Sequence, residues 1–544
     1  MMKKIRLLGG ILFFVLALFS LENAAYAKEV PPDGNIPLTS EYFPDEWFLK
    51  SMVRYDKNKD GCLSPEEIEA VTFLSFAMDL TDFSQVQYFT NVRDLRMECA
   101  NEEYDDEVWI GTDIDLTVFP DLENVLLCLD SRRAPAGSPM VQIRVSGLKH
   151  LKSILVSDVV SPSEHPFDGS DVNIEAIDLR DTPALETVKI YDAAGVVFDD
   201  QNRIREIDIL NMKEIPYNQI ERFENLERLK IWANREDFYA LDVSGCKSLK
   251  RVEIENSWFQ TLVTAGADKL EEICLTSDVL ESVDVSQNRM LKDLRLEGQI
   301  SAIDLRQNTA LEEFSICSDK LNTLDVSRNA KLTGLYVKSD SIKKLNIKKN
   351  RRLKNLSVKC GKISSLNLTA NKKLVSLAIS GTPLRTLDLS KHKELTHLFF
   401  TDNKKLAKLD LSKNTLLGYL KIANTFVKSI NVPEKAKISR LEVTGNKKLT
   451  KLDLSKNKRL SHVDLRNNAL KTLKLGAKAK ISSLYCSKNK LTVLHVPALP
   501  YLSELDCSKN KLTTLDLSKA AALQELVCDK KVKVKGYKGT ITRV

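Results

Sequence analysis

Apolar residues recur at a short, fixed period over the C-terminal part of the chain. The unit consists of an apolar residue, two variable positions, an apolar residue, one variable position and a third apolar residue, as in NLERLKI (225–231), RLKNLSV (352–358) and ALQELVC (522–528). Fifteen such units begin between Leu226 and Leu523, most of them 21 residues apart. A fixed period in this range predicts a solenoid, in which each coil buries its apolar side against its neighbours.

A second alternating segment lies between successive units, as in LDVSRN (324–329), LNIKKN (345–350) and LDLSKN (409–414). Alternation with a period of two is typical of a strand with one buried face, so we expect two short strands per coil and a mostly β fold. Asn308, Asn329, Asn350 and Asn371 follow one another at intervals of 21 residues. We interpret them as a structural ladder whose side chains satisfy backbone amides and carbonyls of their own coil and the next.

The remaining segments complete the predicted domain organisation. We expect a signal peptide at 1–27, a helical cap at 28–88, irregular repeats at 89–225, regular repeats at 226–530 and a C-terminal cap strand at 531–544. The irregular repeats contain the same pattern of apolar positions as the regular ones but at uneven spacing, as in PALETVKI (183–190).

The first 27 residues have the features of a targeting segment. A basic start is followed by an apolar run at 7–21, and Ala25-Tyr26-Ala27 fits an A-x-A cleavage site before Lys28. The apolar run is about 15 residues long, and a transmembrane helix needs about 20. We therefore expect an exported and cleaved chain without a transmembrane segment, secreted or held non-covalently at the cell surface.

The segment DKNKDGCLSPEE (56–67) has the spacing of a twelve-residue EF-hand-like calcium loop. The predicted ligands are Asp56, Asn58, Asp60, Cys62 through its backbone carbonyl, Ser64 through a water, and Glu67. Calcium prefers hard oxygen donors, and Gly61 occupies the sharp turn of the loop. The alternative is a capped helix start alone, with Ser64 as the N-cap and Pro65 at the first helical position. We expect a single structural Ca²⁺, because only one such loop is present.

Charge is divided unevenly along the chain. The net charge is +7, but residues 28–330 carry −28 and residues 331–544 carry +33. A strongly basic surface favours anionic partners through salt-sensitive attraction, which points to anionic cell-wall polymers. The alternative is a lysine-rich face that serves solubility alone.

The variable positions of each unit predict one outward-facing column of side chains on the concave side of the solenoid. Tyr336, Phe399, Tyr419 and Tyr485 place large aromatic side chains on this face, where they would form a ligand-binding patch. The alternative is that neighbouring side chains or a second copy of the chain cover them.

Other constellations give no chemistry. Cys486, Cys507 and Cys528 lie 21 residues apart, and we interpret them as buried thiols that act as small apolar side chains rather than as a disulfide or metal site. No nucleophile elbow, zinc-binding helix or phosphate-binding loop is present, so we expect no enzymatic activity. We also expect no nucleic-acid partner.

The phrases LYCSKNKLTVLHV and LDCSKNKLTTLDLSKA resemble the cysteine-bearing leucine-rich repeats of internalin-J-like surface proteins of Gram-positive bacteria. The segment FPDEWF…DKNKDGCLSPEEI resembles the calcium-loop cap that precedes such repeats in exported clostridial-type proteins. The resemblance implies a leucine-rich-repeat solenoid that takes part in adhesion or recognition, without catalysis.

The expected function is that of an exported recognition or adhesion protein that binds a protein or glycan on its concave face. The alternatives are a passive scaffold or spacer in an extracellular complex, and an electrostatic binder of anionic cell-wall polymers.

Overall fold

The computed structural model describes residues 28–77, 83–98, 113–129, 140–157, 174–200, 203–233, 235–434 and 436–544. The predicted signal peptide lies outside these ranges. The chain divides into two compact units, Met1–Asn234 and Arg235–Val544, and each is described by itself.

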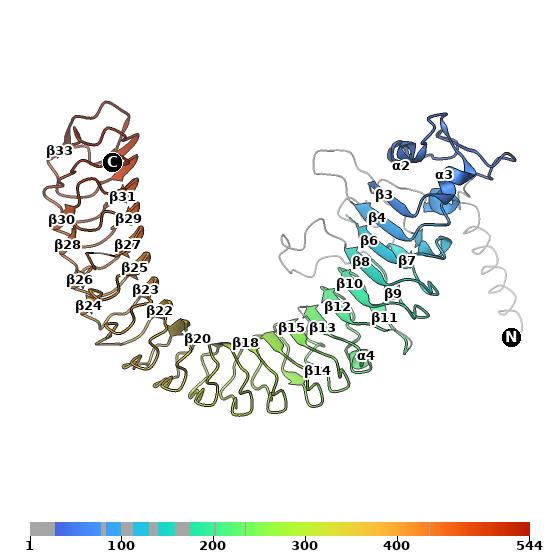
Figure 1. Cartoon of the computed structure of the whole chain (residues 1–544), viewed down its shortest axis with the longest axis horizontal. Coiled ribbons are helices and arrows are strands. Elements are labelled where there is room, and N and C mark those ends of the chain that lie inside the picture. The colour runs from blue at the N-terminus through green and yellow to red at the C-terminus, as the bar shows by residue number, and fades with distance from the viewer. Residues whose placement is uncertain are drawn as a thin grey trace, which may run out of the picture. The chain divides into compact units, whose positions relative to one another are not determined.

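The first unit begins with short helical elements and continues into stacked coils (Figure 1). Helix α2 (Glu46–Met52) is followed by the 3₁₀ turn η1 (Val53–Tyr55) and helix α3 (Pro65–Glu69). The short strands β1 (Ile36–Pro37) and β2 (Cys62–Leu63), on either side of α2 and η1 in the sequence, pair antiparallel. Helix α2 packs on strand β3 (Phe73–Ala77), with the rings of Phe48 and Phe76 4.8 Å apart. Strand β3 lies inside the range predicted for the cap, so the long sheet of this unit begins there.

The coils of the first unit form a parallel sheet on one side and shorter elements on the other. The long sheet contains β3, β4 (Asp94–Glu98), β6 (Asn124–Cys128), β8 (Ser153–Ser157), β10 (Thr187–Tyr191), β12 (Glu206–Leu210) and β13 (Arg228–Trp232). The shorter sheet contains β5 (Asp113–Asp115), β7 (Gln142–Arg144), β9 (Ile177–Asp178) and β11 (Val196–Val197). The connecting elements are η2 (Phe83–Tyr88), η3 (Leu116–Val118) and α4 (Tyr217–Ile220).

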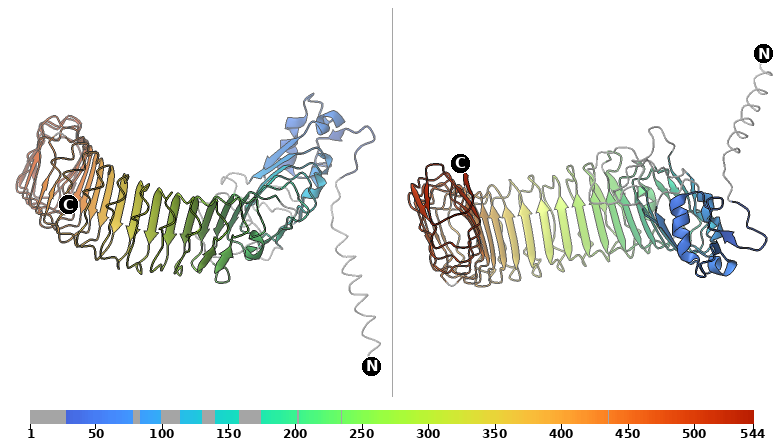
Figure 2. Two further views of the ribbon diagram at one scale, coloured as in Figure 1. Left: turned by 60° about the horizontal axis from the view of Figure 1, so that its bottom comes forward. Right: turned by 90° about the horizontal axis from the view of Figure 1, so that it is seen from above.

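The second unit is a more regular stack with one long parallel sheet. Figure 2 shows its strands side by side, each nearly perpendicular to the direction of stacking. They are β15 (Arg251–Glu255), β17 (Glu272–Thr276), β18 (Asp293–Glu297), β19 (Glu313–Cys317), β20 (Gly334–Lys338), β21 (Asn355–Lys359), β22 (Ser376–Ser380), β23 (His397–Thr401), β25 (Tyr419–Ala423), β27 (Arg440–Thr444), β29 (His462–Asp464), β31 (Ser483–Tyr485), β32 (Glu504–Asp506), β34 (Glu525–Cys528) and β36 (Ile541–Arg543).

Short strand pairs lie on the other side of some of these coils. They are β14 (Ala240–Asp242) with β16 (Thr261–Val263), β24 (Lys408–Asp410) with β26 (Ser429–Asn431), β28 (Lys451–Leu454) with β30 (Thr472–Leu475), and β33 (Thr514–Asp516) with β35 (Lys533–Lys535). The second alternating segment of the repeat is therefore a regular strand in only part of the stack, and in the other coils it is irregular.

In-register pairing places equivalent residues of successive coils next to one another. Leu356 on β21 lies beside Leu335 on β20 and Leu377 on β22, and all three are buried. The apolar positions of the repeat therefore form one continuous core along the stack, as the period predicts. Within the described residues, no helix is both long and apolar enough to cross a membrane.

The asparagine ladder is present, but its hydrogen bonds differ from the prediction. The Asn350 Nδ2 atom donates to the carbonyl oxygens of Val326 and Asn329, each at 2.9 Å, and both belong to the preceding coil. The Oδ1 atom of Asn350 is buried without a hydrogen-bond partner among the described residues. The prediction that each asparagine serves amides and carbonyls of its own and the next coil is therefore wrong: the side chain serves only carbonyls, and only those of the coil before it.

Candidate functional site

The candidate site is the outward face of the long sheet in the second unit. Side chains alternate across the sheet, so the first, third and fifth residue of each five-residue strand point away from the core. Because the strands are paired in register, third-position residues form one column across neighbouring strands. From β18 to β23 this column contains Arg295, Ser315, Tyr336, Ser357, Ala378 and Phe399.

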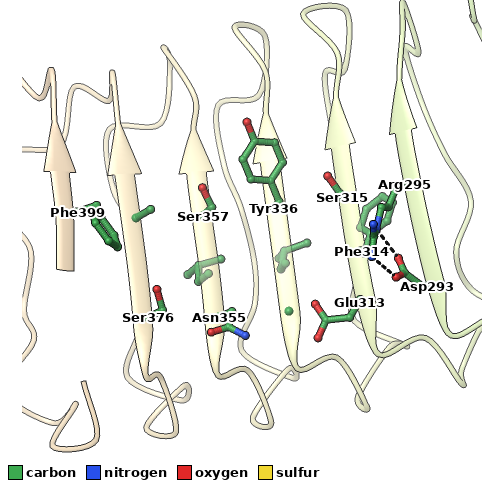
Figure 3. A pocket seen from close by; sticks show the side chains of 14 residues that line it. Asp293, Arg295, Glu313, Phe314, Ser315, Tyr336, Asn355, Ser357, Ser376 and Phe399 are labelled. Atoms are coloured by element: carbon green, nitrogen blue, oxygen red, sulfur yellow. Dashed lines mark hydrogen bonds and ion pairs between the residues drawn. The ribbon is translucent and has the colours of Figure 1, made fainter. Parts of the chain in front are cut away.

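Two aromatic residues enclose small side chains in this column. Tyr336 on β20 and Phe399 on β23 are separated by Ser357 and Ala378 on the two strands between them (Figure 3). Neighbouring strands lie about 4.8 Å apart, so the two strands that carry these rings are about 14 Å apart. The small side chains leave a hollow of about 270 Å³ on this face.

Charged and polar groups surround the hollow near β18 and β19. Arg295 donates from Nη2 to Asp293 at 2.7 Å, and this ion pair lies on the strand next to that of Ser315 (Figure 3). Gly334 gives the Glu313 carboxylate room, because a Cβ atom at this position would collide with it. The floor is therefore made of small, uncharged side chains, and the charges lie at one end.

Phe399 and Tyr419 are in contact, although they do not occupy equivalent positions. Tyr419 on β25 pairs with His397 rather than with Phe399, which pairs with Lys421. The rings of Phe399 and Tyr419 nevertheless pack edge to face with their centroids 4.9 Å apart. Both side chains are half-buried, so this part of the column is less exposed than the sequence predicts.

A buried carboxylate holds Tyr419 in place. The Tyr419 hydroxyl donates to Glu442 Oε1 at 2.7 Å, Arg440 Nε donates to the same oxygen at 2.8 Å, and Lys421 Nζ lies 3.0 Å from Oε2. Burial raises the pKa of Glu442, but the three hydrogen bonds outweigh it and lower the pKa to about 2. The carboxylate therefore stays ionised at neutral pH and fixes the aromatic wall.

Other predicted face residues are covered as well. Tyr336 is exposed, whereas Tyr485 is half-buried and its hydroxyl is bonded to Glu504. Glu442 and Asp464 occupy outward positions but are buried, because Tyr419 and basic side chains cover the first and Arg466 pairs with the second. The column therefore points outward as predicted, but neighbouring side chains cover part of it, which was the alternative. The four predicted aromatic residues also do not form one patch, since Tyr336 borders the hollow and Tyr485 belongs to a separate cluster with His462.

The hollow itself was not predicted from the sequence. The aromatic residues at 336 and 399 were recognised, but the small residues at 334, 357 and 378 were not. The third-position column of the sequence does contain two small residues, Ser357 and Ala378, between two aromatic ones, and this order is the signal of a walled depression.

The predicted calcium loop has the backbone of a tight polar turn. Lys59 and Gly61 adopt positive φ angles of 63° and 83°. The Asp56 carboxylate accepts hydrogen bonds from the backbone N–H of Lys59 at 2.6 Å and of Gly61 at 3.0 Å. The Asn58 side chain accepts one from Asp60 N at 2.9 Å. The loop is thus closed around its own oxygen donors.

Glu67 also points into this loop. Its Oε1 atom accepts from the backbone N–H of Lys57 at 2.6 Å and of Asn58 at 3.2 Å, and Oε2 accepts from Ser64 N at 3.0 Å. The hydrogen bond from Ser64 is the main reason that the pKa of Glu67 falls to about 2. Ser64 and Glu67 form the capping box of α3, so the capped helix that was the alternative reading is present.

The oxygen donors of this loop fit calcium in chemical kind, being two aspartates, an asparagine, a serine and a glutamate in one turn. No group of three or more His, Cys, Asp or Glu side chains is arranged to hold a metal ion in the described part of the chain. A bound ion would have to replace the contacts that Glu67 makes with the loop amides. Calcium binding at Asp56, Asn58, Asp60, Cys62, Ser64 and Glu67 stays a prediction.

The three stacked cysteines are buried and free. Cys486, Cys507 and Cys528 each lie in the apolar core. Burial raises the pKa of the Cys507 thiol to about 12 and also raises that of Cys486. They remain neutral thiols, which agrees with their interpretation as small apolar side chains.

Together these observations define a mostly β leucine-rich-repeat solenoid with coils of about 21 residues. No protein-family model matches the chain, and no curated protein is similar to it in sequence. Among solved structures it is similar to YopM from Yersinia enterocolitica, with a TM-score of 0.53 and 18% identity over 76% of this chain and 92% of that one.

Two further solved structures are similar at lower TM-scores. The functional domain of InlJ from Listeria monocytogenes, which includes a cysteine ladder, gives a TM-score of 0.35 and 17% identity over 93% of this chain and 78% of that one. A leucine-rich-repeat protein of Leptospira interrogans gives 0.38 and 17% over 74% of this chain and 93% of that one. At these identities the comparisons show the fold alone.

Proposed function

We propose that the chain is an exported, non-enzymatic recognition protein that binds a protein or glycan ligand on the sheet face of its second unit. The observation that carries this proposal is the hollow between Tyr336 and Phe399. Its walls are aromatic, its floor is made of small side chains, and it lies on a sheet that in-register pairing makes rigid. Aromatic side chains at such positions supply contact area at low entropic cost, and they stack on sugar rings or apolar side chains.

The position of the wall residues is supported by the groups behind them. Phe399 packs against Tyr419, and the Tyr419 hydroxyl donates a hydrogen bond to the ionised Glu442 carboxylate, which holds the tyrosine ring in place. A pre-ordered wall loses little freedom when a ligand binds, so it favours affinity. The adhesive role is proposed because of this ordered aromatic wall. Secretion and retention at a cell surface are proposed because of the predicted signal peptide.

The proposal is tested by probing an array of glycans and peptides with the purified chain from residue 28 onwards. Tyr336→Ala and Phe399→Ala should each weaken binding to the recognised probes by about tenfold or more, since each removes an aromatic contact. Tyr501→Ala is the matched control, because Tyr501 is an exposed tyrosine outside the hollow. The proposal would be contradicted if all three variants bound the probes with the same affinity as one another. It would also be contradicted if the wild-type chain bound no probe on the array.

A further inference from the structure

The turns that join one coil to the next form a second surface in the same unit. Each turn is centred on a ladder position, and the relevant eight are 329, 350, 371, 392, 414, 436, 457 and 479. We define the turn ridge as the two residues on either side of each of these positions. It is separate from the hollow, which is lined by residues of the strands.

Hydrogen bonds between successive turns hold the turns of the ridge in register. Asn371 Nδ2 donates to the carbonyl of Asn350 at 2.9 Å, and Asn414 Nδ2 donates to that of His392 at 2.8 Å. Further along, the backbone N–H of Lys480 donates to the carbonyl of Lys458 at 3.1 Å. Each turn therefore lies over the one before it at the spacing of one coil, about 4.8 Å. Eight turns make a ridge about 34 Å long.

The ridge is strongly and almost uniformly basic. Its described residues include seventeen lysines and arginines and two acidic residues, Glu394 and Glu434. The basic side chains are exposed, and none of the seventeen forms an ion pair with another described residue. The densest part is made by Lys348, Lys349, Arg351, Arg352, Lys372 and Lys373 on two neighbouring turns.

The turn of an earlier coil provides a contrast. The turn at position 308 carries one basic residue, Arg306, and this residue is paired with Asp304 at 2.6 Å. Acidic residues do lie at the start of some ridge turns, where their side chains accept hydrogen bonds from the backbone of the turn. Asp388, Asp410 and Asp453 each accept a hydrogen bond from the backbone N–H two residues later at 2.9 Å. These three aspartates, Asp325 and the two glutamates give six negative charges against seventeen positive ones, so an excess of eleven positive charges remains on the ridge.

We propose that the turn ridge binds a linear polyanion without aromatic bases that carries a phosphate or sulfate group on each unit. A row of unpaired cations repeated every 4.8 Å offers an extended polymer many simultaneous contacts, each weak and salt-sensitive. The described part of the ridge contains no aromatic residue, whereas proteins that bind single-stranded nucleic acid stack bases on aromatic side chains. The ridge therefore fits a polymer recognised by charge alone.

The experiment measures binding of the chain from residue 28 onwards to inorganic polyphosphate, to dextran sulfate and to oligo(dT), at matched charge and at several salt concentrations. The test variant combines Lys372→Gln, Lys373→Gln, Lys391→Gln and Lys393→Gln in the centre of the ridge. The matched control combines Lys343→Gln, Lys344→Gln, Lys408→Gln and Lys428→Gln. It removes the same charge from exposed positions away from the turns. Thermal unfolding of both variants checks that they fold.

We expect polyphosphate affinity to increase with chain length until the polymer spans the ridge. At low salt the ridge variant should bind at least about tenfold more weakly than the wild type, and its slope of log K against log salt should fall by about 3. The control should change affinity by less than about threefold. The ratio of polyphosphate to dextran sulfate affinity then assigns phosphate or sulfate as the preferred group.

Equal losses in the ridge and control variants would overturn the proposal, because general charge would then explain the binding. Tighter binding of oligo(dT) than of polyphosphate or dextran sulfate would overturn it too. So would a failure of both polyphosphate and dextran sulfate to bind at low salt. The outcome is independent of the hollow, since neither variant alters Tyr336 or Phe399.

Discussion

Removal of one ladder asparagine should loosen the stack at a defined place. In Asn350→Ala the two hydrogen bonds to the carbonyls of Val326 and Asn329 are lost, and Asn350 is fully buried. Each bond contributes about 0.5–1.5 kcal/mol. Both carbonyls keep a second donor, the backbone N–H of Asn329 at 3.1 Å and of Leu332 at 3.2 Å, so neither becomes wholly unpaired. The two bonds together contribute about 1–3 kcal/mol, loss of the unpaired Oδ1 offsets part of this, and we expect a net destabilisation of about 1–2 kcal/mol.

The measurement combines urea unfolding, followed by circular dichroism, with native-state hydrogen exchange. Repeat stacks can unfold in parts, so the exchange experiment is needed to locate the effect. Amides of β20 and β21 should lose protection first, because the two coils that the side chain joins lie there. Asn322→Ala is the control, since Asn322 is exposed and its side chain has no hydrogen bond with the described residues. A free energy of unfolding equal to that of the control, with unchanged exchange in β20 and β21, would refute the reasoning.

Three further predictions follow from other contacts. His392→Asn should stabilise the chain by about 0.5–1.5 kcal/mol in urea unfolding, because His392 bonds only Leu368 O at 3.1 Å whereas an asparagine would also reach Asn371 O; a loss of stability would contradict this. The pKa of Glu442 is lowered to about 2, so its contribution of about 1–2 kcal/mol to the free energy of unfolding is present above pH 4.5 and is lost as the pH falls toward 2. In Glu442→Gln the free energy of unfolding should therefore depend less on pH between 4.5 and 2. The same pH dependence in the variant and the wild type would contradict this. Calcium should raise the thermal midpoint, EDTA should lower it, and Asp56→Ala should respond to neither; equal responses of the variant and the wild type would exclude a site at this loop.

The sequence predicts the architecture well because the repeat encodes it at every level. The 21-residue period, the alternating apolar positions and the ladder asparagines all require the same stacking, so that small local ambiguities do not change the fold. The prediction was less accurate where local geometry decides. The direction of the asparagine bonds depends on which carbonyls face the buried amide, and the period does not contain that information.

The face of the sheet was predicted only in outline for a similar reason. The pattern identifies which residues point outward, but not which of them their neighbours cover. Glu442 is charged and occupies a variable position of the repeat, yet Tyr419, Lys421 and Arg440 bury it. The hollow exists because the side chains at positions 357 and 378 are small. Small side chains carry no chemical signal in the sequence that would mark them as part of a site.

The most direct test of the proposed recognition site is to fill the hollow without removing any contact. Ala378 lies on its floor between the two aromatic walls, so Ala378→Trp should occupy the space while leaving the core unchanged. We predict that this variant unfolds at the same temperature as the wild type but loses at least about tenfold in affinity for the array probes that the wild type binds. Unchanged affinity of a folded Ala378→Trp chain for those probes would contradict the account.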